Sequence, residues 1–184
     1  MGLILASQSP RRRELLEKLN IPFSVQVADI DETPDTSLSV QEDLLRISRL
    51  KARAIPRKKG DIVIAADTVV VLDGMILGKP KDRADARRML SALSGRAHQV
   101  MTGLTVLQDE KCLSHTEVTD VFFRPLTEPE IDSYVSSGDC DDKAGSYGIQ
   151  SGAAPFVEKI HGDYYNVVGL PVCRLSLLLK ELSL

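Results

Sequence analysis

The stretch that decides the fold is Ile62-Val63-Ile64-Ala65-Ala66-Asp67-Thr68-Val69-Val70-Val71-Leu72. Its β-branched and aliphatic residues predict a long strand over Asp61–Leu72, and Asp73-Gly74 predicts a hairpin turn before Met75-Ile76. Asp67 and Thr68 interrupt this apolar run. Because an unpaired carboxylate is costly to bury, Asp67 must pair with a cation, bind a metal ion, or lie where the strand opens into a cleft. A structural salt bridge or a bulge at the strand end is the alternative to a functional site.

Working outward from this strand, the sequence alternates strands and helices. The expected strands are Leu3–Ala6, Phe23–Val27, Asp61–Leu72, Gln99–Gln108, Cys112–Phe123 and Phe156–Ile160, and the expected helices are Ser9–Leu19, Val40–Ile55, Asp82–Leu93, Thr127–Val135 and Leu170–Leu182. Ser9 suits a helix N-cap and Pro10 a first helical position, and Thr127 with Glu130 forms a capping box. Because hairpins accompany the alternation, we predict a mixed α/β fold with a mixed sheet, in a single domain over residues 1–184.

The composition excludes several classes of protein. The chain has 184 residues, of which 43% are hydrophobic and 27% charged, which argues against disorder, and no apolar run reaches the roughly 18 residues of a membrane span. Only 4% of the residues are aromatic and the net charge is -3, which argues against binding nucleic acid by stacking or by overall charge. Three widely spaced cysteines and the absence of a secretory signal predict a reducing, cytoplasmic location.

Three arginines stand at an unfavourable place for positive charge. Arg11, Arg12 and Arg13 fall in the first turn of the first expected helix, where the helix dipole disfavours each of them by roughly 0.3–1 kcal/mol. A bound anion would reverse this effect, since free amides, guanidinium groups and the hydroxyls of Ser7 and Ser9 would converge on it. A solvated basic turn, balanced by nearby glutamates, is the alternative.

Lys51 is a further charge at an unfavourable position. It falls on the apolar stripe of the second expected helix, four residues after Ile47. A lysine whose stem packs while its amine reaches water is the commoner explanation of such a position. Gly78-Lys79-Pro80 is a weak turn signal and does not fit a P-loop. Glu32 lies in a polar loop and is unremarkable by itself.

Taken together, the segments resemble the Maf family of nucleoside triphosphate pyrophosphatases over essentially the whole chain. The motifs that carry the resemblance are Leu5-Ala6-Ser7-Gln8-Ser9-Pro10-Arg11-Arg12, Asp31-Glu32, Lys51-Ala52, Ala66-Asp67-Thr68, Gly78-Lys79-Pro80, Ser94-Gly95 with His98, Asp142-Lys143-Ala144-Gly145 with Tyr147 and Gln150, and Asn166-Val167-Val168-Gly169-Leu170-Pro171. The resemblance implies an elongated mixed sheet flanked by helices, a central nucleotide-binding cleft, and in many members a homodimer. It also implies hydrolysis of a nucleoside triphosphate to the monophosphate and pyrophosphate with a divalent metal, Mg²⁺ or Mn²⁺.

The resemblance also assigns roles to residues. Asp67 resembles the proposed general base, and Glu32 and Asp67 the carboxylates that hold the metal ion. Phosphate-binding roles fall on Ser7, Arg12, Arg13, Lys51 and Lys79. Arg11, Thr68 and Gln150 resemble positions associated with base selection. Thr68 and the Tyr147-Gly148-Ile149-Gln150 ending are similar to the subgroup that acts on dTTP and UTP, and modified pyrimidine triphosphates are further candidate substrates.

Two alternatives remain open at this level. The chain could be a non-catalytic regulator of cell division or a nucleic-acid-binding protein that uses the basic stretch Lys51–Lys59, since the family has been linked to division arrest. It could also be the same enzyme with a different nucleotide preference. Pyrophosphate release from a panel of triphosphates separates these hypotheses.

Overall fold

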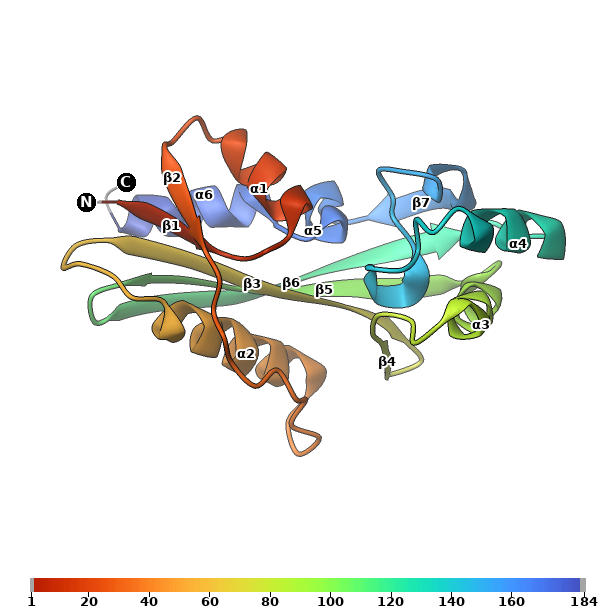
Figure 1. The fold of residues 1–184 in the computed structure, drawn as a ribbon, viewed down its shortest axis with the longest axis horizontal. Helices are drawn as coiled ribbons and strands as arrows, with labels where there is room; N and C mark the ends of the chain where they lie inside the picture. The colour runs from red at the N-terminus through yellow and green to blue at the C-terminus, as the bar shows by residue number, and fades with distance from the viewer. Residues whose placement is uncertain (1, 183–184) are drawn as a thin grey trace. The chain divides into compact units, whose positions relative to one another are not determined.

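The computed structural model describes residues 2–182 and has a mixed α/β fold, as predicted. Its seven strands form one sheet in the order β2-β1-β3-β5-β6-β7, with β4 paired to β3. Strand β1 is parallel to both β2 and β3, whereas the β3–β4 and β6–β7 pairs are antiparallel. The predicted mixed sheet flanked by helices is therefore confirmed (Figure 1).

The elements lie close to their predicted positions. The strands are β1 (Leu3–Ala6), β2 (Phe23–Gln26), β3 (Ile62–Leu72), β4 (Met75–Leu77), β5 (Ala97–Gln108), β6 (Lys111–Phe123) and β7 (Val157–His161). The helices are α1 (Pro10–Glu17), α2 (Val40–Ala54), α3 (Arg83–Leu93), α4 (Glu128–Ser136), α5 (Tyr164–Val168) and α6 (Val172–Glu181), with 3₁₀ turns at Ala144–Ser146 and Ala154–Phe156. Helix α5 and the two 3₁₀ turns were not predicted, because such short segments carry no clear periodicity.

The chain divides into two compact units. The first takes the described parts of Met1–Thr68 and Gly169–Leu184 together with Thr102–Glu117, and the second takes Val69–Met101 and Val118–Val168. The boundary falls directly after Thr68 in β3. The single-domain organisation stays a prediction.

In the first unit, helices cover both faces of the strands β1 and β3. Figure 1 shows α1 and α6 on one face and α2 on the other. The Ser9 hydroxyl accepts from the Arg12 amide at 3.4 Å, which confirms the predicted cap of α1, and Ser39 caps α2 in a capping box with Glu42. Ala52 of α2 and Ile55, the residue directly after the helix, belong to a core that includes β1 and β3 residues.

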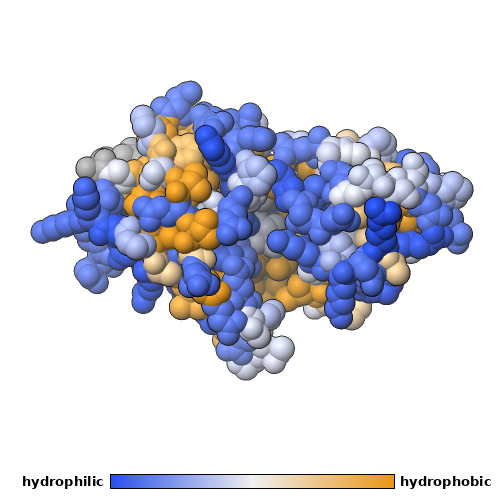
Figure 2. Space-filling view, viewed as in Figure 1, coloured by the Kyte–Doolittle hydropathy of each residue, from blue (hydrophilic) through white to orange (hydrophobic). Residues whose placement is uncertain are grey.

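The surface of the face drawn in Figure 2 is mostly hydrophilic, with hydrophobic side chains exposed in small groups. On the edge strand β2 and just after it, Val25 and Val27 are 43% and 53% exposed. No helix within residues 2–182 is long and apolar enough to cross a membrane.

The second unit has its own apolar core beneath α3 and α4. Leu90 of α3, Ile131 of α4 and Phe123 of β6 are buried in it. The predicted Asp73-Gly74 hairpin joins β3 to β4, and both residues have the positive φ angles of a type I′ turn, 51° and 77°. The predicted capping box of Thr127 and Glu130 is present at α4.

One histidine is buried in this core. His98 is 3% exposed, its Nε2 lies 2.8 Å from the Tyr147 hydroxyl, and its ring meets Phe123 edge-on at 5.0 Å. Burial lowers the pKa of His98 to about 4, so the ring is neutral near pH 7. In the unfolded chain the same ring has an ordinary pKa and takes up a proton at higher pH.

This difference predicts that acid destabilises the protein through His98. Because the folded-state pKa lies below the unfolded-state value, the stability is fully present above about pH 6.5 and is lost as the pH falls toward 4. Between pH 7 and pH 5 this contribution should fall by about 2 kcal/mol, measured by urea unfolding. His98→Gln should remove that part of the pH dependence, and the exposed control His161→Gln should retain it. Equal pH dependence in wild type and His98→Gln would contradict the prediction.

Candidate functional site

The strand order of the first unit defines where a ligand site is expected. From β1 the chain runs through α1 to β2 on one side of β1, and then through α2 to β3 on the other side. In parallel sheets, ligands bind at the carboxyl ends of the strands where the connections diverge in this way. The carboxyl end of β1 leads to Ser7 and the start of α1, and β3 continues there through Asp67 and Thr68.

A cluster of two carboxylates around one ammonium group lies at this end of the strands. Lys51 Nζ of α2 lies 2.8 Å from Asp67 Oδ1 of β3 and 2.8 Å from Glu32 Oε2 of the polar loop before α2. Lys51 is only 8% exposed, so its amine is paired rather than extended into water. Asp67 is thus paired with a cation, one of the three outcomes expected for a carboxylate in an apolar strand. We call these three residues the ion cluster.

Arg12 occupies the other side of Asp67-Thr68. Its Nε donates to the Gly169 carbonyl oxygen at 2.8 Å, and its two terminal nitrogens donate to Thr68 Oγ1 at 3.0 Å and Ser7 Oγ at 3.4 Å. Burial lowers the pKa of the Arg12 guanidinium, while the nearby charges of Asp67 and Glu32 act to raise it. An arginine remains protonated under such shifts, so a fixed positive charge stands beside the two carboxylates.

The three arginines of α1 have different surroundings. Arg11 and Arg12 are both partly buried, whereas Arg13 is exposed and pairs with Glu17 at 3.2 Å. Arg13 also lines a hollow of about 530 Å³ with residues between α1 and β2. In this structure Arg13 therefore matches the solvated alternative, and its phosphate-binding role stays a prediction.

Two of the predicted site residues belong to the second unit. Lys79 is exposed in the segment after β4, and Gln150 is exposed in a turn that follows the 3₁₀ segment Ala144–Ser146. The structure brings together Ser7, Arg12, Glu32, Lys51, Asp67 and Thr68 in the first unit. The roles of Lys79 and Gln150 stay predictions.

The ion cluster fits a divalent cation. The carboxylates of Glu32 and Asp67 both lie 2.8 Å from Lys51 Nζ, so they are near enough to each other to share a metal ion beside that ammonium. Two carboxylate oxygens are a donor set typical of Mg²⁺, which keeps several waters and binds substrate phosphates at its other positions. Within residues 2–182 no group of three or more His, Cys, Asp or Glu side chains is placed to hold a metal ion.

Sequence reasoning missed Thr102 and quoted Gly169 only within a motif, without the role that it has in supporting Arg12. Thr102 is fully buried in β5 and its hydroxyl lies 2.9 Å from Thr68 Oγ1. Gly169 supplies its carbonyl to Arg12 from just after α5, with a φ angle of 123° that favours glycine. A threonine on an apolar strand gives no separate signal, and the pairing of Gly169 with Arg12 spans 157 residues.

Parallel strands that diverge at a basic helix start, beside paired carboxylates, define a candidate phosphate-binding enzyme of the α/β class. The chain belongs to the Maf family, since the sequence profile described as "Maf-like protein" matches residues 2–182. A protein of Bacillus cytotoxicus named dTTP/UTP pyrophosphatase is 49% identical over 97% of this chain and 94% of its own length. One of Symbiobacterium thermophilum with the same name is 51% identical over 97% and 93%.

Two solved structures share the fold. The Ham1 protein of Staphylococcus aureus superposes with a TM-score of 0.56 at 13% identity, covering 98% of this chain and 99% of its own. A HAM1 protein from Coxiella burnetii gives a TM-score of 0.55 at 20% identity with the same coverage. At these identities the likeness shows the fold alone.

The geometry of Arg12 predicts that its planar guanidinium is required for stability. Arg12→Lys should lower the free energy of unfolding by about 1–3 kcal/mol, because a single ammonium cannot reach Ser7, Thr68 and Gly169 together. The matched control is Arg13→Lys, which keeps an exposed ion pair and should change stability by less than about 0.5 kcal/mol. The free energy of unfolding is measured by urea unfolding. Equal losses in the two variants would show that the hydrogen bonds of the Arg12 guanidinium do not stabilise the protein.

Proposed function

We propose that this chain hydrolyses dTTP and UTP between the α and β phosphates and releases the monophosphate and pyrophosphate. The observation that carries the proposal is the ion cluster beside Arg12, at the divergence point of the parallel strands. The proposal is also supported by relatives named dTTP/UTP pyrophosphatase at 49% and 51% identity over nearly the whole chain. Modified pyrimidine triphosphates belong to the proposed substrate class.

In this proposal Asp67 is the general base. Its carboxylate takes the proton of the attacking water, and it is positioned for this by the rigid strand β3 and by Lys51. Ser7, Arg12, Arg13, Lys51 and Lys79 bind the phosphates and stabilise the charge that builds up on the leaving pyrophosphate. Once substrate is bound, Lys51 can donate to a phosphate oxygen as well as to Asp67, since an ammonium has three donors.

The proposal includes a divalent metal ion, Mg²⁺ or Mn²⁺, held by Glu32 and Asp67. Such an ion supplies charge neutralisation to the triphosphate and lowers the pKa of a bound water. Arg12 and Lys51 would bind the phosphate oxygens that the ion leaves uncovered. This arrangement explains why two carboxylates can stand in a site for a polyanion.

Base selection is assigned to Arg11, Thr68 and Gln150. The amide of Gln150 presents a donor and an acceptor, which suits the imide edge of thymine or uracil. A base that leaves this amide unpaired would be rejected by the cost of an unsatisfied polar group. Thr68 is already held by Arg12 and Thr102, so its hydroxyl has a fixed direction.

A nucleic-acid-binding regulator is less well supported. Lys51 is buried in the ion cluster and does not contribute to an exposed basic surface with Arg57, Lys58 and Lys59. A homodimer and a cytoplasmic location remain parts of the proposal.

The proposal predicts which product is released and from which nucleotide. With Mg²⁺, dTTP and UTP should give pyrophosphate rather than orthophosphate, faster than dCTP, dATP, dGTP or 7-methyl-GTP, and EDTA should abolish the reaction. Asp67→Asn should lower kcat by about 10²–10⁴-fold without loss of the fold, because the amide cannot accept the proton. The assay is pyrophosphate release with circular dichroism of each variant.

The matched control is Asp73→Asn, which changes an exposed carboxylate in the turn just after β3, where asparagine tolerates the positive φ. It should retain the wild-type rate. A near-normal rate in Asp67→Asn would exclude Asp67 as the base. Preference for a purine nucleotide would favour the same enzyme with another substrate, and salt-sensitive DNA binding without hydrolysis would favour a regulator.

A further inference from the structure

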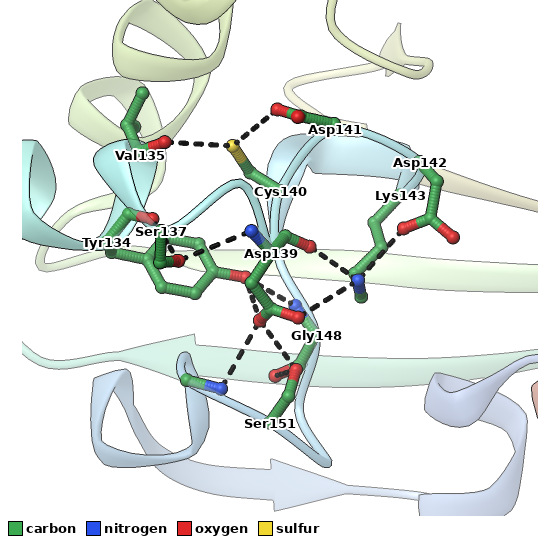
Figure 3. A network of polar contacts seen from close by, with 11 residues as sticks. Tyr134, Val135, Ser137, Asp139, Cys140, Asp141, Asp142, Lys143, Gly148 and Ser151 are labelled. Carbon is green, nitrogen blue, oxygen red and sulfur yellow. Dashed lines mark hydrogen bonds and ion pairs between the residues drawn. The ribbon is translucent and has the colours of Figure 1, made fainter.

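The turn that carries Gln150 is fixed by a polar network in the second unit. The network joins Tyr134 of α4 to Asp139, Lys143, Gly148 and Ser151 of the following loop (Figure 3). Lys143 and Gly148 belong to the motifs that suggested the family, whereas Tyr134, Asp139 and Ser151 do not. The family resemblance therefore does not explain what this network does.

Both ends of the turn over residues 148–151 are bound to the same pair of side chains. At the first end, the Gly148 amide donates to the Tyr134 hydroxyl at 3.1 Å. At the second end, Ser151 Oγ donates to Asp139 Oδ2 at 2.6 Å and the Gly152 amide donates to the same oxygen at 3.2 Å. The Tyr134 hydroxyl in turn donates to Asp139 Oδ2 at 2.8 Å, so one hydrogen-bonded pair closes the turn.

The turn is also closed by its own backbone and by steric limits. The Ser151 amide donates to the Gly148 carbonyl at 3.2 Å, which places Gln150 third of the four turn residues. A Cβ on Gly148 would stand 2.5 Å from Ser151 Oγ and 2.7 Å from Lys143 Cε, so a larger residue there would displace two side chains of the network. The side chain of Gln150 is exposed while the turn around it is tied down.

Charge holds the network together. Lys143 Nζ lies 3.1 Å from Asp139 Oδ1 and also donates to the Asp139 carbonyl oxygen, and the Lys143 side chain is only 12% exposed. Burial acts to raise the pKa of Asp139, but hydrogen bonds from Ser151, Tyr134 and Lys143 outweigh it and the pKa is lowered. Asp139 is thus an ionised acceptor for all its donors at neutral pH.

We infer that Tyr134 and Asp139 are positioning residues for base selection, because they lock the turn that presents the Gln150 amide to the nucleobase. The inference rests on the base-selection role of Gln150 in the proposed function. A rigid turn lets the amide distinguish thymine from cytosine, whereas a loose one lets it adapt to either. Neither side chain needs to touch the nucleotide.

The experiment compares selectivity, the ratio of kcat/KM for dTTP to that for dCTP, in single and double variants. Gln150→Ala should lower the ratio about tenfold or more, because the base loses its hydrogen-bond partner. Tyr134→Phe, which removes only the hydroxyl, should lower it by about fivefold, mainly through a higher KM for dTTP. In Gln150→Ala/Tyr134→Phe the second substitution should add nothing, because Tyr134 acts through Gln150.

The matched control is Tyr147→Phe. It removes a buried hydroxyl from the same loop that lies 2.8 Å from His98 Nε2 and does not hold the turn. It should cost stability but keep the selectivity. Equal loss of selectivity in Tyr147→Phe and Tyr134→Phe would overturn the inference, since any loosening of the second unit would then suffice.

A second measurement is independent of catalysis. In Tyr134→Phe, amide hydrogen exchange should become faster at Gly148 and Gly152, and in Tyr147→Phe it should remain at the wild-type rate there. Unchanged exchange in Tyr134→Phe would overturn the inference whatever the enzyme's substrate. If Gln150→Ala lowers selectivity and Tyr134→Phe does not, the inference fails and the proposed function stands. If Gln150→Ala keeps full selectivity, the base-selection role and this inference both fail, and hydrolysis itself is unaffected.

Discussion

The candidate site of the first unit depends on one electrostatic constraint, the presence of the Asp67 carboxylate within the apolar strand β3. Its cost is offset by Lys51, whose own position on the apolar side of α2 would be unfavourable without a carboxylate to meet. Each charge therefore depends on the other, and the ion pair links α2 to β3. Glu32 joins the same ammonium from the loop that precedes α2, so the pairing also orders a segment that has few apolar residues.

The same constraint links structure to function. A cation held between two carboxylates marks a point where a metal ion and phosphate oxygens could exchange partners with the protein. Arg12 lies on the side of Asp67-Thr68 that is opposite to Lys51. Its hydrogen bonds go to the neutral oxygens of Gly169 and Thr68. In the proposed function this guanidinium binds phosphate oxygens, and the neighbouring carboxylates serve as base and metal ligands. Within the second unit, the turn over residues 148–151 holds the exposed Gln150 amide that the proposed function assigns to base selection.

Much of this could be predicted from the sequence because local signals were strong. The β-branched run of β3, the Ser9 cap, the Asp73-Gly74 turn and the capping box at Thr127 each encode structure within a few residues. The charges that are costly by position, Lys51 and Asp67, were also visible, but their mutual pairing was not, since it joins a helix to a strand. Thr102 and the Tyr134–Asp139 pair could not be picked out from the sequence. A buried hydroxyl or a loop carboxylate shows no local pattern, and its contacts are made with residues of other segments.

The most direct test of the central claim is a double-mutant cycle on Lys51 and Asp67, read as the free energy of urea unfolding. Lys51→Met and Asp67→Asn should each destabilise the protein by about 2 kcal/mol, less than for a fully buried pair because Asp67 retains some exposure. The double variant should lose at least about 1 kcal/mol less than the two single losses added together, since neither charge is then left unpaired. Additive losses within about 0.5 kcal/mol would contradict the account, because the two charges would then be independent.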